Sequence, residues 1–293
     1  MITSVVPENA GGMSVTKYML RAYPMLPAFV MRQAVKKKEV KIAGKRVGTD
    51  ETVCGGDTVQ VYCDKKYEPQ PLEVVFSDEN LIAFIKPAGL PVDKDADGIG
   101  DDTVCSRLLK ISENARPVHR LDTGTAGIML ASMNSDAEEK LLRAFKDHKV
   151  EKHYLCIAVG RMPKKKQSLT AYLTKKADAS KVFVSDEPAR GAKVIETEYT
   201  VLSEKTVTGT YLSLLDVRIF TGRTHQIRAH MAHIGCPLLG DDKYGNRTVN
   251  KKLGAGEIYL VCKKMALTDA QGLEKYSGMW FEGNETVWEI MKS

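Results

Sequence analysis

Apolar positions in the first quarter of the chain predict two short helices. The residues that recur at helical intervals are Val15, Tyr18, Met19 and Ala22. Pro24 ends this segment, and Pro27 suits the first turn of a second helix. The residues of that second helix available for a core are Phe29, Val30 and Ala34. Residues 40–47 then flank an Ala43-Gly44 turn and predict a hairpin, and residues 58–62 alternate like a strand.

The later part of the chain alternates strands with helices. The segments with strand character are residues 81–85, 128–131, 154–159, 196–202 and 211–219, the last two expected to pair antiparallel. The expected helices are residues 103–110, the segment from Ser135 with the face Leu141, Leu142 and Phe145, and residues 224–234. Ser135 and Glu138 form a capping box, and Gly235 fits the position just after the last helix. Together these elements predict an α+β fold with a mixed, largely antiparallel sheet flanked by helices.

A polar stretch with two prolines and no periodicity, residues 64–71, is typical of a linker. It divides the chain into a small domain at residues 12–63 and a larger one at residues 72–293. Between two of the larger domain's elements, residues 93–102 form an acidic, glycine-containing loop.

Composition narrows the function classes. The 293 residues are 43% hydrophobic and 27% charged, which excludes disorder and fibrous repeats as the main organisation. The first residues lack a signal peptide pattern, and apolar runs are far shorter than the roughly 18 residues of a membrane span, so we expect a cytoplasmic protein. The six cysteines form no C-x-x-C pair and are expected to be reduced, mostly as core residues.

The charge distribution favours a polyanion as partner, although a solvated surface explains it equally well. The formal net charge is +6. One cluster carries seven basic residues and one acid, Glu39; the basic residues are Arg32, Lys36, Lys37, Lys38, Lys41, Lys45 and Arg46. A cluster of this kind suits the phosphates of a nucleic acid.

The segment His119-Arg120-Leu121-Asp122 is a candidate for chemistry because it is polar, lies between apolar strands and precedes Gly124 and Gly127. Two interpretations remain open: close approach of a ligand to the backbone, or a turn capped by the aspartate. A kinase catalytic loop is excluded. It needs Asp directly after His-Arg and Asn five residues later, where this chain has leucine and alanine.

Residues 221–236 contain three histidines and a cysteine, His225, His230, His233 and Cys236. Their spacing gives no full ligand set for a metal, so we expect the histidines to form hydrogen bonds within the fold. Arg223 and Arg228 lie beside the apolar face of the helix, where they would meet a buried carboxylate or a phosphate, or else face solvent. Tyr154, after Lys152-His153, begins a strand and would either stack on a base or pack at the edge of the core.

Together these motifs resemble an RluA-type pseudouridine synthase. The segments that carry the resemblance, in chain order, are the Lys86-Pro87-Ala88-Gly89-Leu90 turn, His-Arg-Leu-Asp with Thr-Gly-Thr-Ala-Gly, Lys-His-Tyr, Gly-Arg-Thr-His-Gln-Ile-Arg-Ala-His and Gly-Cys-Pro-Leu-Leu-Gly-Asp-Asp-Lys-Tyr-Gly. The resemblance covers about residues 72–268. Residues 12–63 resemble an S4-type RNA-binding domain through Phe29, Arg32, the lysine run and Gly44-Lys45, which implies a small N-terminal unit of helices and a β-hairpin.

The resemblance implies conversion of uridine in RNA to pseudouridine, with no metal or organic cofactor. Asp122 would be the catalytic aspartate, Tyr154 would stack on the base and handle protons, and Arg228 would pair with Asp122, Arg223 being the second choice. Arg120 would help extrude the uridine. The further substrate-binding residues would be His119, Arg223, Arg32, Lys36, Lys37, Lys38 and Lys45.

Ribosomal RNA of the large subunit is the expected substrate, since S4-type domains suit structured RNA. Three alternatives stay open: a transfer RNA substrate, a non-catalytic RNA-binding or ribosome-assembly protein, and a His/Cys metallohydrolase. The chain departs from the family pattern at Ile85, where asparagine is common, and at Leu260-Val261-Cys262, where Leu-His-Ala is common.

Overall fold

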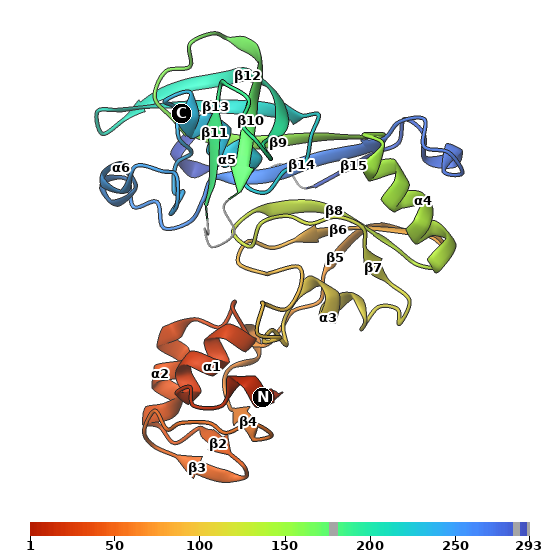
Figure 1. The fold of residues 1–293 in the computed structure, drawn as a ribbon. Helices are drawn as coiled ribbons and strands as arrows, with labels where there is room; N and C mark the ends of the chain where they lie inside the picture. Colours follow the sequence, from red (N-terminus) through yellow and green to blue (C-terminus); the bar gives the residue numbers. More distant parts are fainter. Residues whose placement is uncertain (176–180, 284–287, 292–293) are drawn as a thin grey trace. The chain divides into compact units, whose positions relative to one another are not determined.

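A computed structural model describes residues 1–175, 181–283 and 288–291. The chain divides into two compact units (Figure 1). The small unit combines Met1–Glu73 with Gly89–Pro117, and the large unit combines Val74–Ala88 with Val118–Ser293. Residues 89–117 therefore group with the N-terminal part of the chain, across the linker expected at residues 64–71. No helix among the described residues combines the length and apolarity needed to cross a bilayer.

In the small unit, the segment Met1–Glu73 contains a four-stranded antiparallel sheet, in the order β1-β4-β2-β3, and two α-helices. Its elements are β1 (Ile2–Val5), α1 (Val15–Ala22), α2 (Ala28–Lys36), β2 (Val40–Ile42), β3 (Lys45–Val47) and β4 (Thr58–Val61). Both predicted helices and the predicted hairpin are present. Ser14 caps α1 by accepting a hydrogen bond from the backbone N–H of Lys17, and Pro27 precedes α2. Strand β1 lies ahead of the predicted domain start at residue 12 and pairs with β4.

The core of the small unit contains Tyr18 and Met19, which the pattern indicated, and also Met31, which it did not; all three are without solvent exposure. Ile99, from the acidic loop, packs into the same core. Nearby, a short helix α3 (Val104–Leu108) carries a buried ion pair, in which Arg107 Nε lies 2.7 Å from Asp102 Oδ1. The packing of Ile99, together with the hydrogen bonds from the backbone N–H groups of Asp101 and Asp102 to the carbonyl oxygen of Ala22 at 2.9 and 3.0 Å, explains why residues 89–117 belong to this unit.

The large unit is organised by one mixed sheet, in the order β11-β10-β12-β13-β9-β14-β8-β6-β5, with β15 beside β14 (Figure 1). Its strands are β5 (Glu73–Ser77), β6 (Leu81–Lys86), β8 (Ala126–Ser132), β9 (Val150–Val159), β10 (Lys166–Lys175), β11 (Val182–Ser185), β12 (Lys193–Val207), β13 (Thr210–Ile219), β14 (Leu260–Leu267) and β15 (Trp280–Glu282). A two-residue strand, β7 (Arg116–Pro117), ends the small unit. Strand β14 runs parallel to β8, whereas the succession from β10 through β12, β13 and β9 to β14 pairs antiparallel, as do β6 and β8. The predicted mixed, largely antiparallel sheet is confirmed.

Three helices accompany this sheet: α4 (Ser135–Lys146), α5 (Gln226–His233) and α6 (Arg247–Lys252). Helix α5 presents Ile227 and Met231 to the core, and Gly235 follows it with a φ of 81°, as the sequence indicated. The long hairpin of β12 and β13 joins in the predicted antiparallel register, and β13 pairs in turn with β9. The start of β9 and the start of α5 are thereby brought together.

Of the two glycines that follow Asp122, Gly127 is required by the packing of two strands. At Gly127, where β8 runs parallel to β14, an added Cβ would lie 2.2 Å from the carbonyl oxygen of Cys262, and the φ of 118° disfavours any other residue. Gly124 faces only the side chain of Ile258, 3.3 Å from the position of a Cβ. Close backbone approach is therefore real at Gly127, but the partner is a neighbouring strand and no ligand is needed to explain it.

Several local expectations were wrong. The cap of α4 is Asn134, whose side chain accepts from the N–H of Ala137, because the helix begins one residue earlier than a Ser135 cap allows. Leu142 is 46% exposed, since α4 turns only Leu141 and its helical neighbours toward the sheet. Phe29 is 48% exposed and lies edge-on to Tyr67 instead of entering the core. All six cysteines are free thiols, but only Cys156, Cys236 and Cys262 are buried.

Candidate active site

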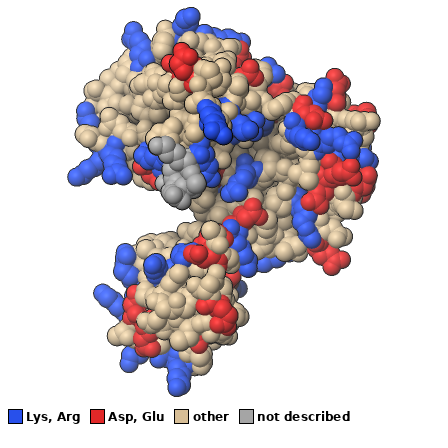
Figure 2. Space-filling view, in the orientation of Figure 1, with Lys and Arg blue, Asp and Glu red and all other residues tan. Residues whose placement is uncertain are grey.

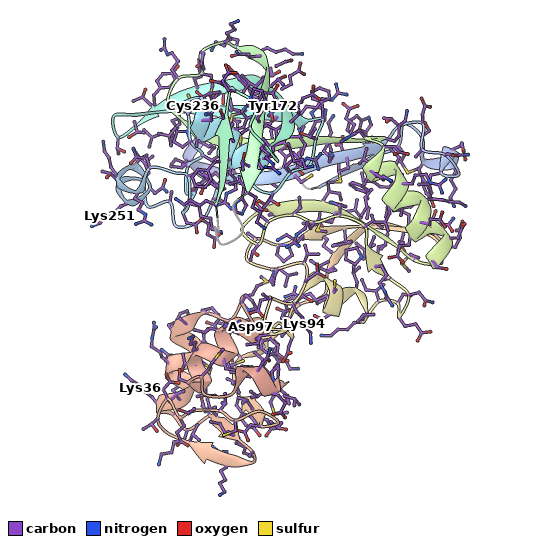
Figure 3. The ribbon with its side chains drawn as sticks, in the orientation of Figure 1. Lys36, Lys94, Asp97, Tyr172, Cys236 and Lys251 are labelled. Atoms are coloured by element: carbon purple, nitrogen blue, oxygen red, sulfur yellow. The ribbon has the colours of Figure 1, made fainter. Side chains whose placement is uncertain are left out.

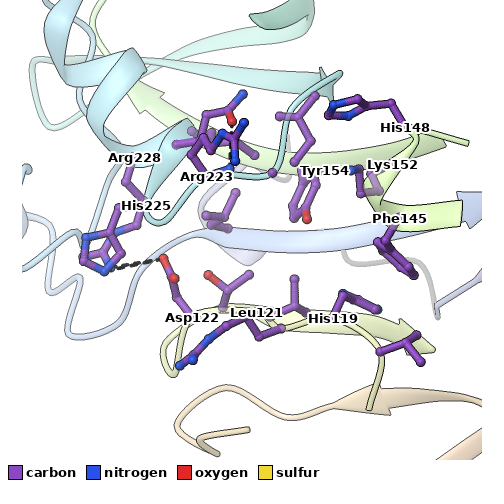
Figure 4. A pocket seen from close by; sticks show the side chains of 18 of the residues that line it. His119, Leu121, Asp122, Phe145, His148, Lys152, Tyr154, Arg223, His225 and Arg228 are labelled. Atoms are coloured by element: carbon purple, nitrogen blue, oxygen red, sulfur yellow. Dashed lines mark hydrogen bonds and ion pairs between the residues drawn. The ribbon is translucent and has the colours of Figure 1, made fainter. Parts of the chain in front are cut away.

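A cavity of about 500 Å³ opens in the large unit, and six of the predicted site residues line it (Figure 4). These are His119, Arg120, Asp122, Tyr154, Arg223 and Arg228. Among the described residues of the lining, Asp122 is the one carboxylate, whereas five are lysine or arginine. The cavity is thus a basic pocket with a single acid, a charge pattern suited to a polyanionic ligand.

Asp122 lies in the loop before β8 and faces the start of α5. Its Oδ2 atom is 3.5 Å from Nη1 of Arg228 and 3.9 Å from Nε2 of His225. The side chain of Asp122 is 26% exposed, while those of Arg228 and His225 are 8% and 12% exposed. Asp122 therefore presents its carboxylate to the cavity against two largely buried side chains, Arg228 and His225 (Figure 4). Arg228, the first choice from sequence, takes the partner position.

The guanidinium of Arg228 is fixed by a second, fully buried carboxylate. Nε and Nη2 donate to the two oxygens of Asp241 at 2.7 and 2.8 Å, and Nη2 also donates to Asp242 at 2.8 Å. Burial opposes ionisation of Asp241, but the bonds from Arg228 and from two backbone N–H groups outweigh it and hold its pKa below the usual range. Two nitrogens of Arg228 are thus occupied, and the third is left to point at Asp122.

Tyr154 and Lys152 share one face of β9, since they are two residues apart on a strand, and both line the cavity. Burial, together with its neighbour Cys262, keeps the pKa of the Tyr154 phenol well above its ordinary value, so the hydroxyl is protonated. Burial lowers the pKa of Lys152, whose ammonium lies 6.0 Å from the ring centre of Phe145. The ring of Tyr154 and the ammonium of Lys152 form part of the cavity wall near Asp122.

His119 belongs to the opposite wall. Its Nε2 accepts from the backbone N–H of Leu130 at 3.0 Å, and its ring stacks on Phe145 with centroids 4.6 Å apart. Burial, aided by the charge of Lys152, lowers the pKa of His119 to about 3, so the ring is neutral. Arg120 and Arg223 are both exposed at the cavity. His119 therefore forms part of the wall, while the two arginines present exposed side chains to the cavity.

Lys86 holds the loop that carries Asp122 through buried hydrogen bonds. Its side chain is fully buried, and Nζ donates to the carbonyl oxygens of Pro87 and Thr123 at 3.0 and 3.1 Å. Burial lowers the pKa of Lys86 to about 7, although the negative charge of Asp122 acts in the opposite direction. The Lys86-Pro87 turn at the end of β6 is thus joined, through the hydrogen bond of Lys86, to the residue that follows Asp122.

The other predicted binding residues belong to the small unit. Arg32, Lys36, Lys37, Lys38 and Lys45 are exposed at the end of α2 and on the hairpin. Lys36 projects from α2 into solvent (Figure 3). In the view of Figure 2, lysine and arginine side chains stand at the surface of both units among acidic ones.

The histidines of the α5 segment have separate partners. His225 meets Tyr244, His230 meets Thr197 at 3.0 Å, and His233 meets Asp186 at 2.9 Å. The described residues contain no group of three side chains suited to a metal ion. The expected hydrogen bonds within the fold are present.

The sequence did not predict four residues that shape this site as site residues: Lys86, His225, Asp241 and Tyr244. Each lies in a segment that carried the family resemblance, so a signal existed. The partners that matter for the site are distant in the chain, 13 positions for Asp241 and Arg228 and 103 for His225 and Asp122, and nothing local indicates which side chains meet.

Comparison with known proteins gives a consistent result. A family model described as RNA pseudouridylate synthase matches residues 80–233. The ribosomal large subunit pseudouridine synthase C of Rickettsia bellii is 32% identical over 251 residues, covering 78% of this chain and 82% of that protein. The ribosomal large subunit pseudouridine synthase D of Escherichia coli O157:H7 is 30% identical over 275 residues, covering 88% and 80%. The structure of human RNA Pseudouridylate Synthase Domain Containing 1 superimposes with a TM-score of 0.58 at 21% identity, over 72% of this chain and 89% of that one.

Proposed function

The chain belongs to the RNA pseudouridylate synthase family, and from this premise we propose that it modifies large-subunit ribosomal RNA, with Asp122 as catalytic residue and no cofactor. The enzyme class, an RNA pseudouridine synthase of the RluA type, follows from the family. Two relatives named for the large ribosomal subunit support the substrate. The observation that carries the assignment of Asp122 is its position as the one described carboxylate of a basic cavity, opposite a fixed arginine.

The reaction breaks the N-glycosidic bond of a uridine and rejoins the ring through carbon. The N1 atom of the base gains a proton and C5 loses one, so the product is an isomer. Attack on the ribose, attack on the ring and removal of a sugar proton each need an ionised carboxylate at the reacting atoms. Oδ2 of Asp122 lies 3.5 Å from Nη1 of Arg228, so a guanidinium faces the carboxylate that must react.

Access to a stacked base requires flipping it out, at a cost of a few kcal/mol. Tyr154 offers an aromatic face inside the cavity, on which the flipped uracil stacks. Arg120 and Arg223 are exposed and long enough to occupy the space the base leaves and to contact phosphates. His119, neutral and built into the wall, contributes shape to the binding site.

We assign RNA docking without base specificity to the small unit, as an S4-like domain. Its antiparallel hairpin and two helices, with exposed basic residues at the end of α2, fit that role. A ribosomal RNA substrate agrees with the cytoplasmic location expected from the sequence.

The test is incubation of the purified protein with unmodified ribosomal RNA and, separately, transfer RNA. Pseudouridine has the mass of uridine, so it is mapped after reaction with a carbodiimide and mild alkaline treatment, which leaves the adduct on pseudouridine alone. We expect new pseudouridine in large-subunit ribosomal RNA, and none with D122N. Product in transfer RNA alone would overturn the substrate. Full activity of D122N would overturn the catalytic aspartate, and tight RNA binding without product in either pool would favour the non-catalytic alternative.

A further inference from the structure

Behind Asp122, a chain of three hydrogen-bonding groups leads from β11 to the carboxylate. The backbone N–H of Val182 donates to the hydroxyl of Tyr244 at 2.8 Å, and that hydroxyl lies 3.0 Å from Nδ1 of His225. The other ring nitrogen of His225, Nε2, faces Oδ2 of Asp122 at 3.9 Å. The interaction between the histidine and Asp122 is drawn as a dashed line in Figure 4.

The direction of the protons follows from the groups present. Because Val182 supplies the proton of its own bond to Tyr244, the phenolic proton is available to Nδ1. A lone pair on Nε2 would face the negative oxygen of Asp122, whereas an N–H there is attracted to it. Both arguments place the single proton of a neutral imidazole on Nε2.

The charges around His225 favour the neutral ring. Burial is the largest effect that lowers its pKa, and the cations Arg228 and Lys243 add to it, while Asp122 and Asp241 act in the opposite direction. Lys181 and Arg228 also lie over the ring of Tyr244, at 5.8 and 5.5 Å from its centre. Arg228, Lys181 and Lys243 thus already supply positive charge around His225 and Tyr244. A neutral His225 ring adds a hydrogen-bond donor there and no further charge.

The backbone of His225 is held in a conformation that few residues adopt. Its φ of 53° lies in the left-handed region, directly before α5, where asparagine or glycine is more usual. Such strain persists only where the surroundings determine the conformation. Here the conformation directs the ring between Tyr244 and Asp122.

We propose that His225 is a positioning residue that, oriented by Tyr244, donates its Nε2–H to Asp122 and holds the carboxylate against Arg228. The separation of 3.9 Å shortens to a hydrogen bond when the nucleotide fills the cavity. This inference rests on the proposed role of Asp122. His225 and Tyr244 act through the aspartate and touch no reacting atom.

The first test needs no activity. Long-range ¹H–¹⁵N correlation spectra of the protein labelled in its six histidines report which ring nitrogen carries the proton. The H225N variant assigns the signal by its disappearance, and asparagine tolerates the left-handed backbone. We expect a protonated Nε2 and an accepting Nδ1 at neutral pH, with the Nδ1 resonance displaced in Y244F. A proton on Nδ1 in the wild-type protein would overturn the proposal.

The second test is a double-mutant cycle on the rate of pseudouridine formation, measured with the unmodified RNA that the wild-type protein converts. H225N and Y244F should each lower the single-turnover rate by about 10- to 100-fold, the range for a misplaced catalytic group, with an unchanged RNA dissociation constant. The double variant should be no slower than H225N alone, because Tyr244 acts through His225. Additive losses would show that Tyr244 acts elsewhere, for example through Val182, and would overturn the relay. An active D122N variant would refute the catalytic aspartate while leaving the spectroscopic result intact, so the two failures are distinguishable.

Discussion

Arg228 binds Asp241 through two parallel hydrogen bonds, and this pair lies almost completely out of solvent. The same guanidinium directs its remaining nitrogen to Asp122. Arg228 therefore pairs with Asp241 in the protein interior and faces Asp122 in the site. Substitutions at Arg228 should affect both stability and activity.

Arg228→Ala should destabilise the protein by about 3–5 kcal/mol, because it leaves the Asp241 carboxylate buried without a partner. Arg228→Lys keeps the charge but loses the two-pronged geometry, and should retain more stability while losing most activity. Urea unfolding and the pseudouridine assay measure the two effects. The control is Arg143→Ala on α4, an exposed pair with Glu139 that contributes about 0.5 kcal/mol or less. Equal stability of Arg228→Ala and the control would contradict the buried-pair argument.

Tyr154→Phe separates stacking from proton handling. The ring stays, so RNA affinity should change less than about twofold, whereas loss of the hydroxyl should lower the single-turnover rate by about 100-fold or more. Tyr154→Leu should lose both affinity and rate, because the aromatic face is gone. Binding by fluorescence anisotropy and single-turnover kinetics distinguish them. A fully active Tyr154→Phe variant would restrict the residue to stacking.

Gly127→Ala should lower the free energy of unfolding by at least about 2 kcal/mol, since a φ of 118° is strained for alanine and its Cβ meets the backbone of β14. Gly124→Ala is the matched control, because its Cβ meets one methyl group of Ile258. We expect thermal and urea unfolding to separate the two variants. Similar midpoints for both would argue against the close strand approach.

His153 makes part of the stability dependent on pH. Its Nδ1 lies 2.8 Å from Asp216 and its Nε2 lies 3.0 Å from Glu151; the bond to Asp216 is the main reason that its pKa is raised, against the effect of burial. A raised pKa stabilises the fold below the unfolded value of about 6.5, and this contribution disappears as the pH rises through the folded pKa. Urea unfolding of wild type and His153→Gln should differ by up to about 1 kcal/mol at pH 6, after solvent screening. The difference should vanish at high pH; one that grows with pH would reverse the sign and refute the assignment.

The lysines of α2 and the turn after it should act through charge. Replacing Lys36, Lys37 and Lys38 together by alanine should weaken RNA binding and reduce the slope of log affinity against log salt. On duplex-like RNA the reduction should be about 0.9 for each phosphate that the lysines neutralise in the wild-type complex. The corresponding triple arginine variant keeps the charge and should preserve the slope. Filter binding over a salt series measures both, and an unchanged slope in the alanine variant would exclude these residues from the RNA interface.

Local patterns in the sequence predicted most of the helices and strands and the chemistry that they carry. Helical and alternating spacing predicted α1, α2, the β2–β3 hairpin and the β12–β13 pair, because these depend on contacts between near neighbours in the chain. The motif around Asp122 and the arginine of α5 indicated a family and a reaction through residue types that the chemistry requires.

Which side chains meet depends on the packing of segments that are distant in the chain. Sheet order places β9 beside both β13 and β14, and so brings Tyr154, Asp122 and Arg228 to one cavity from segments far apart in the chain. The same long-range packing buries Asp241 against Arg228 and brings Gly127 close to the backbone of β14. It also places the hydroxyl of Tyr244 beside the ring of His225. These relationships depend on burial and on desolvated charge. Both are properties of a packed interior, and the linear pattern does not contain them.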